Sequence, residues 1–117
     1  MLTVDSNPIV LNRRKYPRMP LFDSCIVKLS GQDRVYEGRM VNISAGGFAF
    51  STRDKELEHI KGQNIEINIP NLKIPGCNVL EGHVIRISAA EGQYVIGCRM
   101  PQDNMLIRDY VAEHFKE

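Results

Sequence analysis

Residues 65–70 read Ile65-Glu66-Ile67-Asn68-Ile69-Pro70, and this stretch decides the class of fold. Isoleucine alternates with polar residues at a period of two, which predicts a strand with one buried face. Pro70 ends the strand because it cannot donate a hydrogen bond to a neighbour. The chain around this segment is therefore expected to be mainly β.

The same period recurs on both sides of this segment. Upstream, it predicts strands over residues 22–29, over 35–43 and from residue 48 onward. Downstream, it predicts a long strand over residues 77–88 with a bulge near Gly82, a turn at 89–92, and a sixth strand over 94–100. Residues 52–61 are expected to form a short helical turn. Six short strands favour a small antiparallel barrel, because closure removes exposed sheet edges.

The two ends of the chain differ from this pattern. Ile107, Val111 and Phe115 repeat every four residues, which predicts an amphipathic helix over about residues 103–116, capped by Asp103 or Asn104. This helix is expected to pack on the barrel or on a partner. Residues 1–12 show no clear period, and we interpret them as a leader or as a linker from a longer chain. The domain itself is placed at residues 13–117.

Length and composition limit the class of protein. The 117 residues allow one domain with one core, and 43% hydrophobic and 25% charged residues are typical of a globular protein. Residues 1–20 hold four cations and one acidic residue, although the whole chain has a net charge of +1. A long DNA duplex is therefore not expected as a partner, whereas a small anion is. No membrane segment or signal peptide is evident, and we expect a cytoplasmic protein.

Catalytic and metal-binding patterns are absent from the sequence. No Gly-x-Ser-x-Gly elbow, P-loop, dinucleotide-binding motif or paired carboxylates occur, so we expect no catalytic residues, no cofactor and no enzyme activity. The cysteines form no CxxC pair, and no disulfide framework is expected; two of them lie in apolar alternation, where a free cysteine behaves as a small buried residue. The histidines are isolated, which argues against a metal site. These residues are Cys25, Cys77, Cys98, His59, His83 and His114.

A basic segment precedes the predicted strands and reads Arg13-Arg14-Lys15-Tyr16-Pro17-Arg18. Pro17 lacks an amide hydrogen and biases Tyr16 away from helical angles, so residues 13–20 are expected to form an extended or turning arm. The planar donor fork of arginine fits phosphate, and also the O6 and N7 atoms of guanine. By itself, this segment is equally consistent with an anion-binding arm and with a solvated basic tail.

A second informative stretch lies at the end of a predicted strand and reads Asn42-Ile43-Ser44-Ala45-Gly46-Gly47. Asn42 and Ser44 are two residues apart, so their side chains are expected on the same side, and both can donate and accept hydrogen bonds. Gly46 and Gly47 permit positive φ and allow a ligand or another backbone to approach closely. When these six residues are taken alone, an ordinary bend between strands explains them better than a ligand site does.

The two stretches together, in this order, resemble the signature of the PilZ domain family, RxxxR followed by (D/N)xSxxG. Arg14 and Arg18 supply the first half, and Asn42, Ser44 and Gly47 supply the second. A weaker third element of the family is a late strand that ends in Gly-x-Arg followed by an aromatic or aliphatic residue. Residues 97–100 resemble it, although methionine stands at position 100 where the family more often has phenylalanine. The resemblance covers about residues 12–115 and implies a six-stranded PilZ-type β-barrel with a C-terminal helix.

The resemblance also implies a ligand, the bacterial second messenger cyclic di-GMP. Arg14 and Arg18 would hold its phosphates and the Hoogsteen edge of guanine, and the arm would order over the ligand. Asn42 and Ser44 would hydrogen-bond to guanine or phosphate. Gly46 and Gly47 belong to the same implied site, where Gly47 would leave room for a base.

Arg13 bears on the number of ligands. In the PilZ family, an arginine directly before RxxxR is associated with an intercalated dimer of the messenger, and Arg13 occupies that position. The resemblance therefore implies two nucleotides per protomer, whereas the alternative is that Arg13 is a solvated cation. Lys15 is expected to contact neither ligand.

Other interpretations remain open from the sequence. The chain could be a degenerate PilZ-type module that binds a partner protein and no nucleotide, or a small barrel that binds single-stranded nucleic acid. The latter predicts interleaved aromatic and cationic residues on one face, which are not evident. Arg86 and Arg99 could line the ligand site or be ordinary exposed residues, and Tyr16 could stack on a base or pack on the barrel. A partner protein or domain is expected, but no residue indicates which output it controls.

Overall fold

The alternating isoleucines of residues 65–69 are buried, as their period predicts. In the computed structural model, which describes residues 15–115, strand β5 (Asn64–Asn68) carries Ile65 and Ile67 into the core, and Ile69 follows directly after it. β5 pairs with β2 on one side and with β6 on the other. The segment that sets the class of fold therefore lies inside the sheet rather than at an edge.

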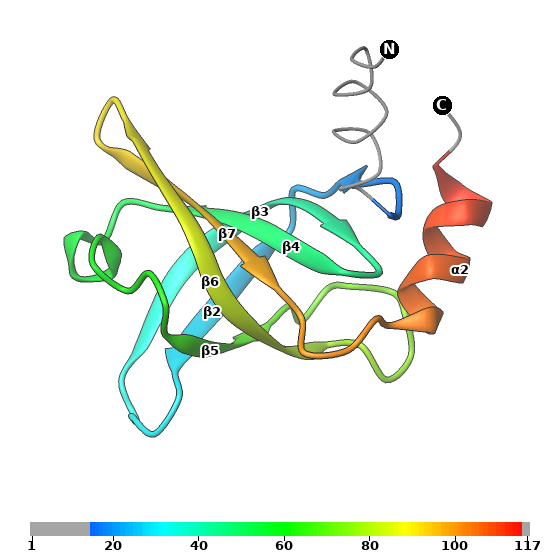
Figure 1. The fold of residues 1–117 in the computed structure, drawn as a ribbon, viewed down its shortest axis with the longest axis horizontal. Coiled ribbons are helices and arrows are strands. Elements are labelled where there is room, and N and C mark those ends of the chain that lie inside the picture. The colour runs from blue at the N-terminus through cyan, green and yellow to red at the C-terminus, as the bar shows by residue number, and fades with distance from the viewer. Residues whose placement is uncertain (1–14, 116–117) are drawn as a thin grey trace, which may run out of the picture.

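Six antiparallel strands close into a barrel (Figure 1). Their order is β3-β2-β5-β6-β7-β4, and β4 pairs back with β3 to complete the ring. The remaining strands of the ring are β2 (Ser24–Leu29), β3 (Val35–Ser44), β4 (Gly47–Thr52), β6 (Val79–Ala90) and β7 (Gln93–Arg99). This confirms the predicted mainly β fold and its six-stranded antiparallel barrel.

The barrel interior is filled by side chains from every strand of the ring. Phe48 and Phe50, which are two residues apart on β4, are both buried. Cys25, Cys77 and Cys98 are buried and free. Burial raises the pKa of the Cys25 and Cys98 thiols to about 12, so both stay protonated at neutral pH and pack as small apolar groups.

The long β6–β7 hairpin differs from its prediction in two places. The register shift lies between Val84 and Arg86, not near Gly82. Glycine is required at residue 82 for a different reason. A Cβ there would lie within 2.6 Å of the Phe48 ring. The strands also continue to Ala90 and Gln93, so the turn contains just Glu91 and Gly92. Both turn residues have positive φ (55° and 79°), which matches the twist of a tight hairpin.

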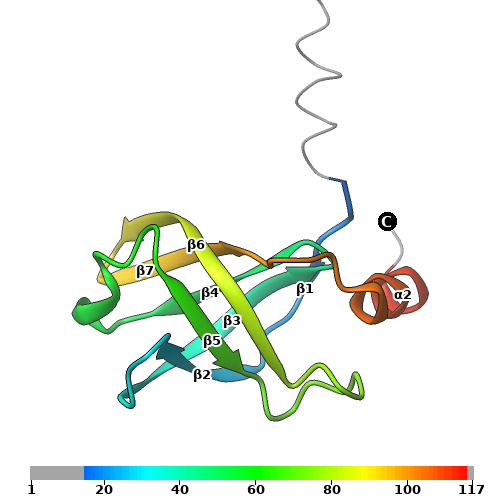
Figure 2. The ribbon, with the colours of Figure 1, turned by 60° about the horizontal axis from the view of Figure 1, so that its bottom comes forward.

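In the described part of the chain, two helical segments flank the barrel. The predicted turn at 52–61 contains a single 3-10 turn, η2 (Lys55–Leu57), whose N-terminal amide is capped by Asp54. The C-terminal helix α2 (Met105–His114) is capped by Asn104, whose side chain accepts from the Ile107 amide. Figure 2 shows α2 beside the barrel near β1 and β3. α2 is therefore shorter than the expected range of about 103–116, and it buries two side chains, Ile107 and Val111.

Within the described residues, no helix is long and apolar enough to cross a membrane. The same part of the chain contains no group of three or more His, Cys, Asp or Glu side chains that could hold a metal ion. The expected leader at residues 1–12, together with Arg13 and Arg14, lies outside the described residues.

Candidate ligand-binding site

A two-residue strand that the sequence did not reveal brings the basic arm to the barrel. β1 (Met19–Pro20) pairs with β3, with Met19 opposite Ile43 and Pro20 opposite Asn42. Continuing this antiparallel register places Arg18 level with Ser44. The arm and the Asn42–Gly47 segment, which are separate in sequence, are therefore neighbours in space.

The start of the described arm is attached to the segment that leads into α2. The Tyr16 hydroxyl donates a hydrogen bond to Asp103 Oδ2 at 3.0 Å. Lys15 Nζ lies 3.5 Å from the same oxygen and 5.5 Å from the centroid of the Tyr16 ring. Tyr16 was open to stacking on a base or packing on the protein, and the structure shows a contact with the protein. Residues 15–18 are not helical, as Pro17 predicts.

The bend between β3 and β4 is held together by Ser44. Its hydroxyl accepts from the Gly46 amide at 3.2 Å and donates to the Gly47 carbonyl at 3.4 Å. Positive φ, which the sequence left possible for Gly46 and Gly47, occurs at neither of them. Gly47 is required for another reason, because a Cβ there would collide with the backbone oxygen of Cys98 on β7. A Cβ on Gly46 would meet nothing closer than Asp103 Oδ1 at 3.8 Å.

Small residues form the floor of the site, and polar or cationic residues flank them. Cross-strand pairing aligns one row of residues across β3, β4, β7 and β6: Asn42, Ala49, Gly97 and Arg86. A second row crosses β4, β7, β6 and β5: Gly47, Arg99, His83 and Asn64. A Cβ on Gly97 would lie 3.5 Å from Arg86 Nη2, so the guanidinium of Arg86 extends over the floor. This arrangement leaves room for a flat group between cations.

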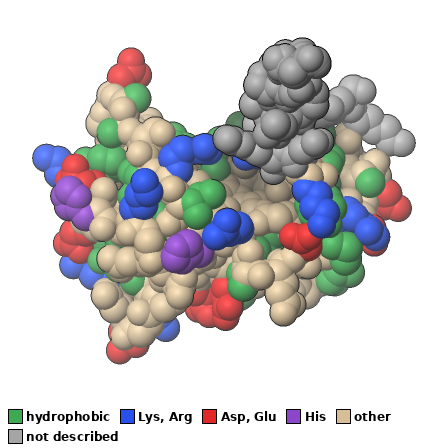
Figure 3. Space-filling view, in the orientation of Figure 1, with side chains coloured by type: hydrophobic (Ala, Val, Ile, Leu, Met, Phe, Trp, Pro, Cys, Tyr) green, Lys and Arg blue, Asp and Glu red, His purple; other side chains and the backbone are tan. Residues whose placement is uncertain are grey.

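Both rows, together with the arm, line one cavity of about 1210 Å³. Figure 3 shows the face over β6, β7 and β4, where Lys and Arg side chains surround an area of uncharged surface. The described lining includes the cations Lys15, Arg18, Arg86 and Arg99 and the acids Glu81 and Asp103. Cations therefore outnumber acids there, and Asp103 is already paired with Lys15.

The structure brings together every predicted site residue that it describes. Arg18, Asn42, Ser44, Gly46 and Gly47 all line the cavity. The positions that sequence reasoning left open, Arg86 and Arg99, line it too.

One residue was discounted from the sequence and belongs to the cavity. His83 lies directly opposite Arg99 on β7 and opposite Asn64 on β5. Its Nδ1 atom is 2.8 Å from Asn64 Oδ1. The signal that could have found it is the strand register, which single-sequence patterns do not fix.

The fold and the cavity together define a small β-barrel domain with a cavity on its outer surface whose lining holds more cations than acids. The profile of the PilZ domain family matches residues 12–113, and the chain belongs to this family. Searching curated proteins gave no match.

Solved structures with the same fold include three longer proteins. The inhibitor of motility MotI/DgrA of Bacillus subtilis has a TM-score of 0.67 and 18% identity, over 86% of this chain and 50% of that one. YcgR of Escherichia coli, in complex with c-di-GMP, has a TM-score of 0.59 and 19% identity, over 86% of this chain and 43% of that one. PlzA of Borreliella burgdorferi, in complex with c-di-GMP, has a TM-score of 0.58 and 16% identity, over 92% of this chain and 44% of that one. The chain thus spans half or less of each of these proteins, and at such identities the likeness shows the fold.

Proposed function

We propose that this protein is a cyclic di-GMP receptor domain that regulates a partner and carries out no catalysis itself. One observation carries the proposal: Arg18, which is distant in sequence from Asn42 and Ser44, lines one cavity with them above a floor of small residues. Membership of the PilZ family supports it, as do the c-di-GMP complexes of YcgR and PlzA, which share the fold.

The residues of the cavity suit the chemistry of a cyclic dinucleotide. Its two phosphates carry negative charge, and Arg18, Arg86 and Arg99 offer forked donors around the cavity. Gly97 and Ala49 keep the floor low, so a base can lie against the barrel. Asn42 can donate and accept hydrogen bonds at a base edge without adding a negative charge.

We further propose that the ligand fixes residues 10–20 over the cavity and so changes the surface offered to a partner protein or domain. Part of this arm already contacts the barrel through β1 and through the Tyr16–Asp103 hydrogen bond. For residues 15–20, the ligand therefore rearranges an attached segment rather than capturing a detached one. Asp103 precedes the cap of α2, and the Asn104 amide donates to the Ala45 carbonyl at 2.8 Å, which joins the bend to the helix.

Calorimetric titration of the 117-residue chain with cyclic di-GMP tests the function. We expect saturable binding that a single-stranded oligonucleotide does not compete away and that weakens as salt is raised. Undetectable binding at high micromolar ligand would exclude the receptor function and favour a PilZ-type module that binds protein without nucleotide.

The same titration tests the role of Arg13. We expect a stoichiometry near two for the wild-type chain and near one for Arg13→Leu, because Arg13 is proposed to hold the second nucleotide of an intercalated dimer. The cavity of about 1210 Å³ supports this, since pockets for one drug-sized ligand usually measure about 300–1,000 Å³. A stoichiometry near one for the wild type, or no change in Arg13→Leu, contradicts the prediction.

A further inference from the structure

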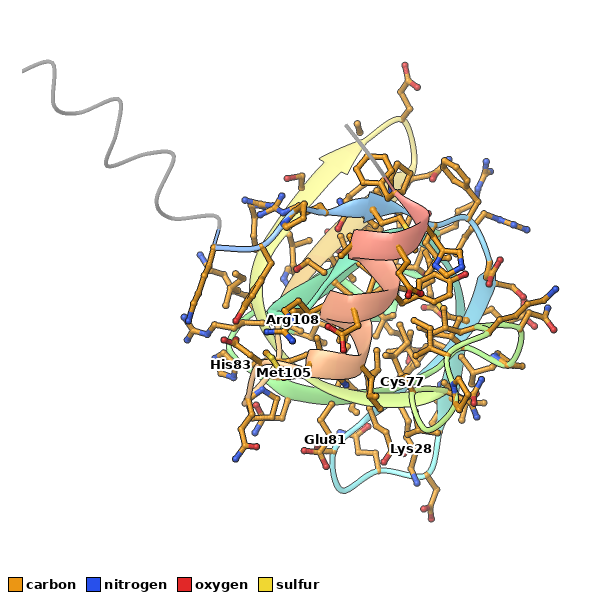
Figure 4. The ribbon with its side chains drawn as sticks, turned by 90° about the vertical axis from the view of Figure 1, so that its right-hand side faces the viewer. Lys28, Cys77, Glu81, His83, Met105 and Arg108 are labelled. Carbon is orange, nitrogen blue, oxygen red and sulfur yellow. The ribbon has the colours of Figure 1, made fainter. Side chains whose placement is uncertain are left out.

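The β6 side of the cavity, two strands away from β4, contains a carboxylate, which a site for a dianion would not be expected to hold. Glu81 on β6 lines the cavity there, with His83 and Asn64 beside it. Figure 4 views the molecule from the α2 side and labels Glu81 and His83 on this strand. Among residues 15–115, no hydrogen bond or ion pair engages the Glu81 carboxylate, whereas Asp103 is held by Tyr16 and Lys15.

The charge of Glu81 determines which part of a cyclic dinucleotide it can face. A carboxylate beside a phosphate is repelled, and the repulsion is strong in a partly desolvated cavity. A carboxylate accepts hydrogen bonds and donates none when ionised. The Watson–Crick edge of guanine presents two adjacent donors, N1–H and the N2 amino group, and therefore matches a carboxylate in bidentate fashion. Adenine presents an unprotonated N1 at that edge, which a carboxylate repels.

The position of Glu81 separates it from the arm. The row Gly47, Arg99, His83 and Asn64 crosses four neighbouring strands. Strands lie about 4.8 Å apart, so this row spans roughly 14 Å from the bend to β5. Arg18 lies at the bend end of the cavity, level with Ser44, whereas Glu81 lies on β6, two strands away from β4 and two residues along from His83. A base held by the arm is therefore not the base that Glu81 reaches.

The wall around Glu81 is held in place by the cross-strand pair next to it. His83 Nδ1 and Asn64 Oδ1 are 2.8 Å apart, which orients both side chains. A fixed wall favours one orientation of a flat base, because a side chain that is already ordered loses less entropy when the ligand binds. The geometry points to one conclusion, which rests on the proposed function: Glu81 is a specificity-determining residue that recognises the Watson–Crick edge of a guanine on the β6 side of the cavity.

A comparison of two ligands on three proteins tests this role. The ligands are cyclic di-GMP and 3′,3′-cyclic GMP–AMP, which differ in one base, and the proteins are the wild-type chain, Glu81→Gln and Glu66→Gln. Glu66 is the matched control, because it lies directly opposite Glu81 on β5 but does not line the cavity. We expect the wild type to bind cyclic di-GMP roughly tenfold or more tightly than the mixed dinucleotide.

The variants separate the possible outcomes. In Glu81→Gln the preference is expected to fall below about threefold, because an amide can both donate and accept and so tolerates either base. Glu66→Gln is expected to keep the wild-type preference. If Glu81→Gln keeps the wild-type preference for cyclic di-GMP over the mixed dinucleotide, the role of Glu81 is overturned and the receptor function stands. The same holds if the variant binds cyclic di-GMP more tightly than the wild type but keeps that preference. Absence of cyclic di-GMP binding to the wild type overturns the receptor function itself.

Discussion

Replacing Arg18 with alanine is expected to weaken cyclic di-GMP binding by roughly 10- to 150-fold. Arg18 lines the cavity from the arm side and lies level with Ser44 by the register of β1. A hydrogen bond to a charged group contributes about 1.5–3 kcal/mol, and each 1.4 kcal/mol is a factor of ten in affinity. The loss is measured by calorimetry on the wild type and on Arg18→Ala at the same salt concentration.

Lys15→Ala is the matched control on the same arm. Lys15 also lines the cavity, but its ammonium is paired with Asp103 and is largely exposed, with a side-chain exposure of 74%. An exposed ion pair contributes little, so we expect affinity to stay within about threefold of wild type. Equal losses in the two variants would mean that the arm acts by its overall charge. Arg18 would then have no specific contact with the ligand.

The fold could be predicted from sequence because its signal is local. Alternation at Ile65, Ile67 and Ile69 fixes a buried strand face wherever that strand pairs, and the same reasoning holds for Phe48 and Phe50. A tight turn also has a local signature. The sequence nevertheless predicts a turn over residues 89–92, whereas β6 continues to Ala90. Small residues such as Ala90 are compatible with either a strand or a turn.

Features that depend on non-local pairing could not be predicted. β1 has two residues and owes its position to pairing with Ile43 and Asn42, so nothing in its own composition marks it as a strand. The bulge at residues 84–86 arises in the pairing of β6 with β7. The sequence predicts the bulge near Gly82 because this glycine interrupts the alternation of the strand. The structure shows instead that Gly82 makes room for the ring of Phe48, a residue far away in sequence.

The site was predictable to the extent that it resembles a family signature. Arg18, Asn42 and Ser44 follow from that resemblance, and all three line one cavity. Arg86 and His83 could not be assigned, because an exposed cation or histidine on a strand looks the same whether it faces a ligand or solvent. Their place in the cavity follows from the strand register, which sets Arg86 opposite Gly97 and His83 opposite Arg99.

Gly47→Ala is expected to destabilise the fold by about 2–3 kcal/mol. The added Cβ would overlap the backbone oxygen of Cys98 and lie 3.3 Å from the Cα of Arg99, and neither atom can move without shifting β7. Overpacking of this kind typically costs about 1–3 kcal/mol, and a backbone neighbour places the cost in the upper part of that range. The free energy of unfolding is measured by urea titration, with an unchanged m-value as the sign that the same fold unfolds.

Gly46→Ala separates this structural requirement from a requirement of the ligand. The nearest atoms to a Cβ at residue 46 are Asp103 Oδ1 at 3.8 Å and Tyr16 Cδ2 at 3.9 Å, both ordinary contact distances. We expect its stability to stay within about 0.5 kcal/mol of wild type, as for most surface substitutions. Similar losses of stability in Gly46→Ala and Gly47→Ala would mean that the bend cannot accommodate a side chain at either position. A loss confined to Gly47→Ala means that Gly47 is needed where β4 packs on β7, with or without a ligand.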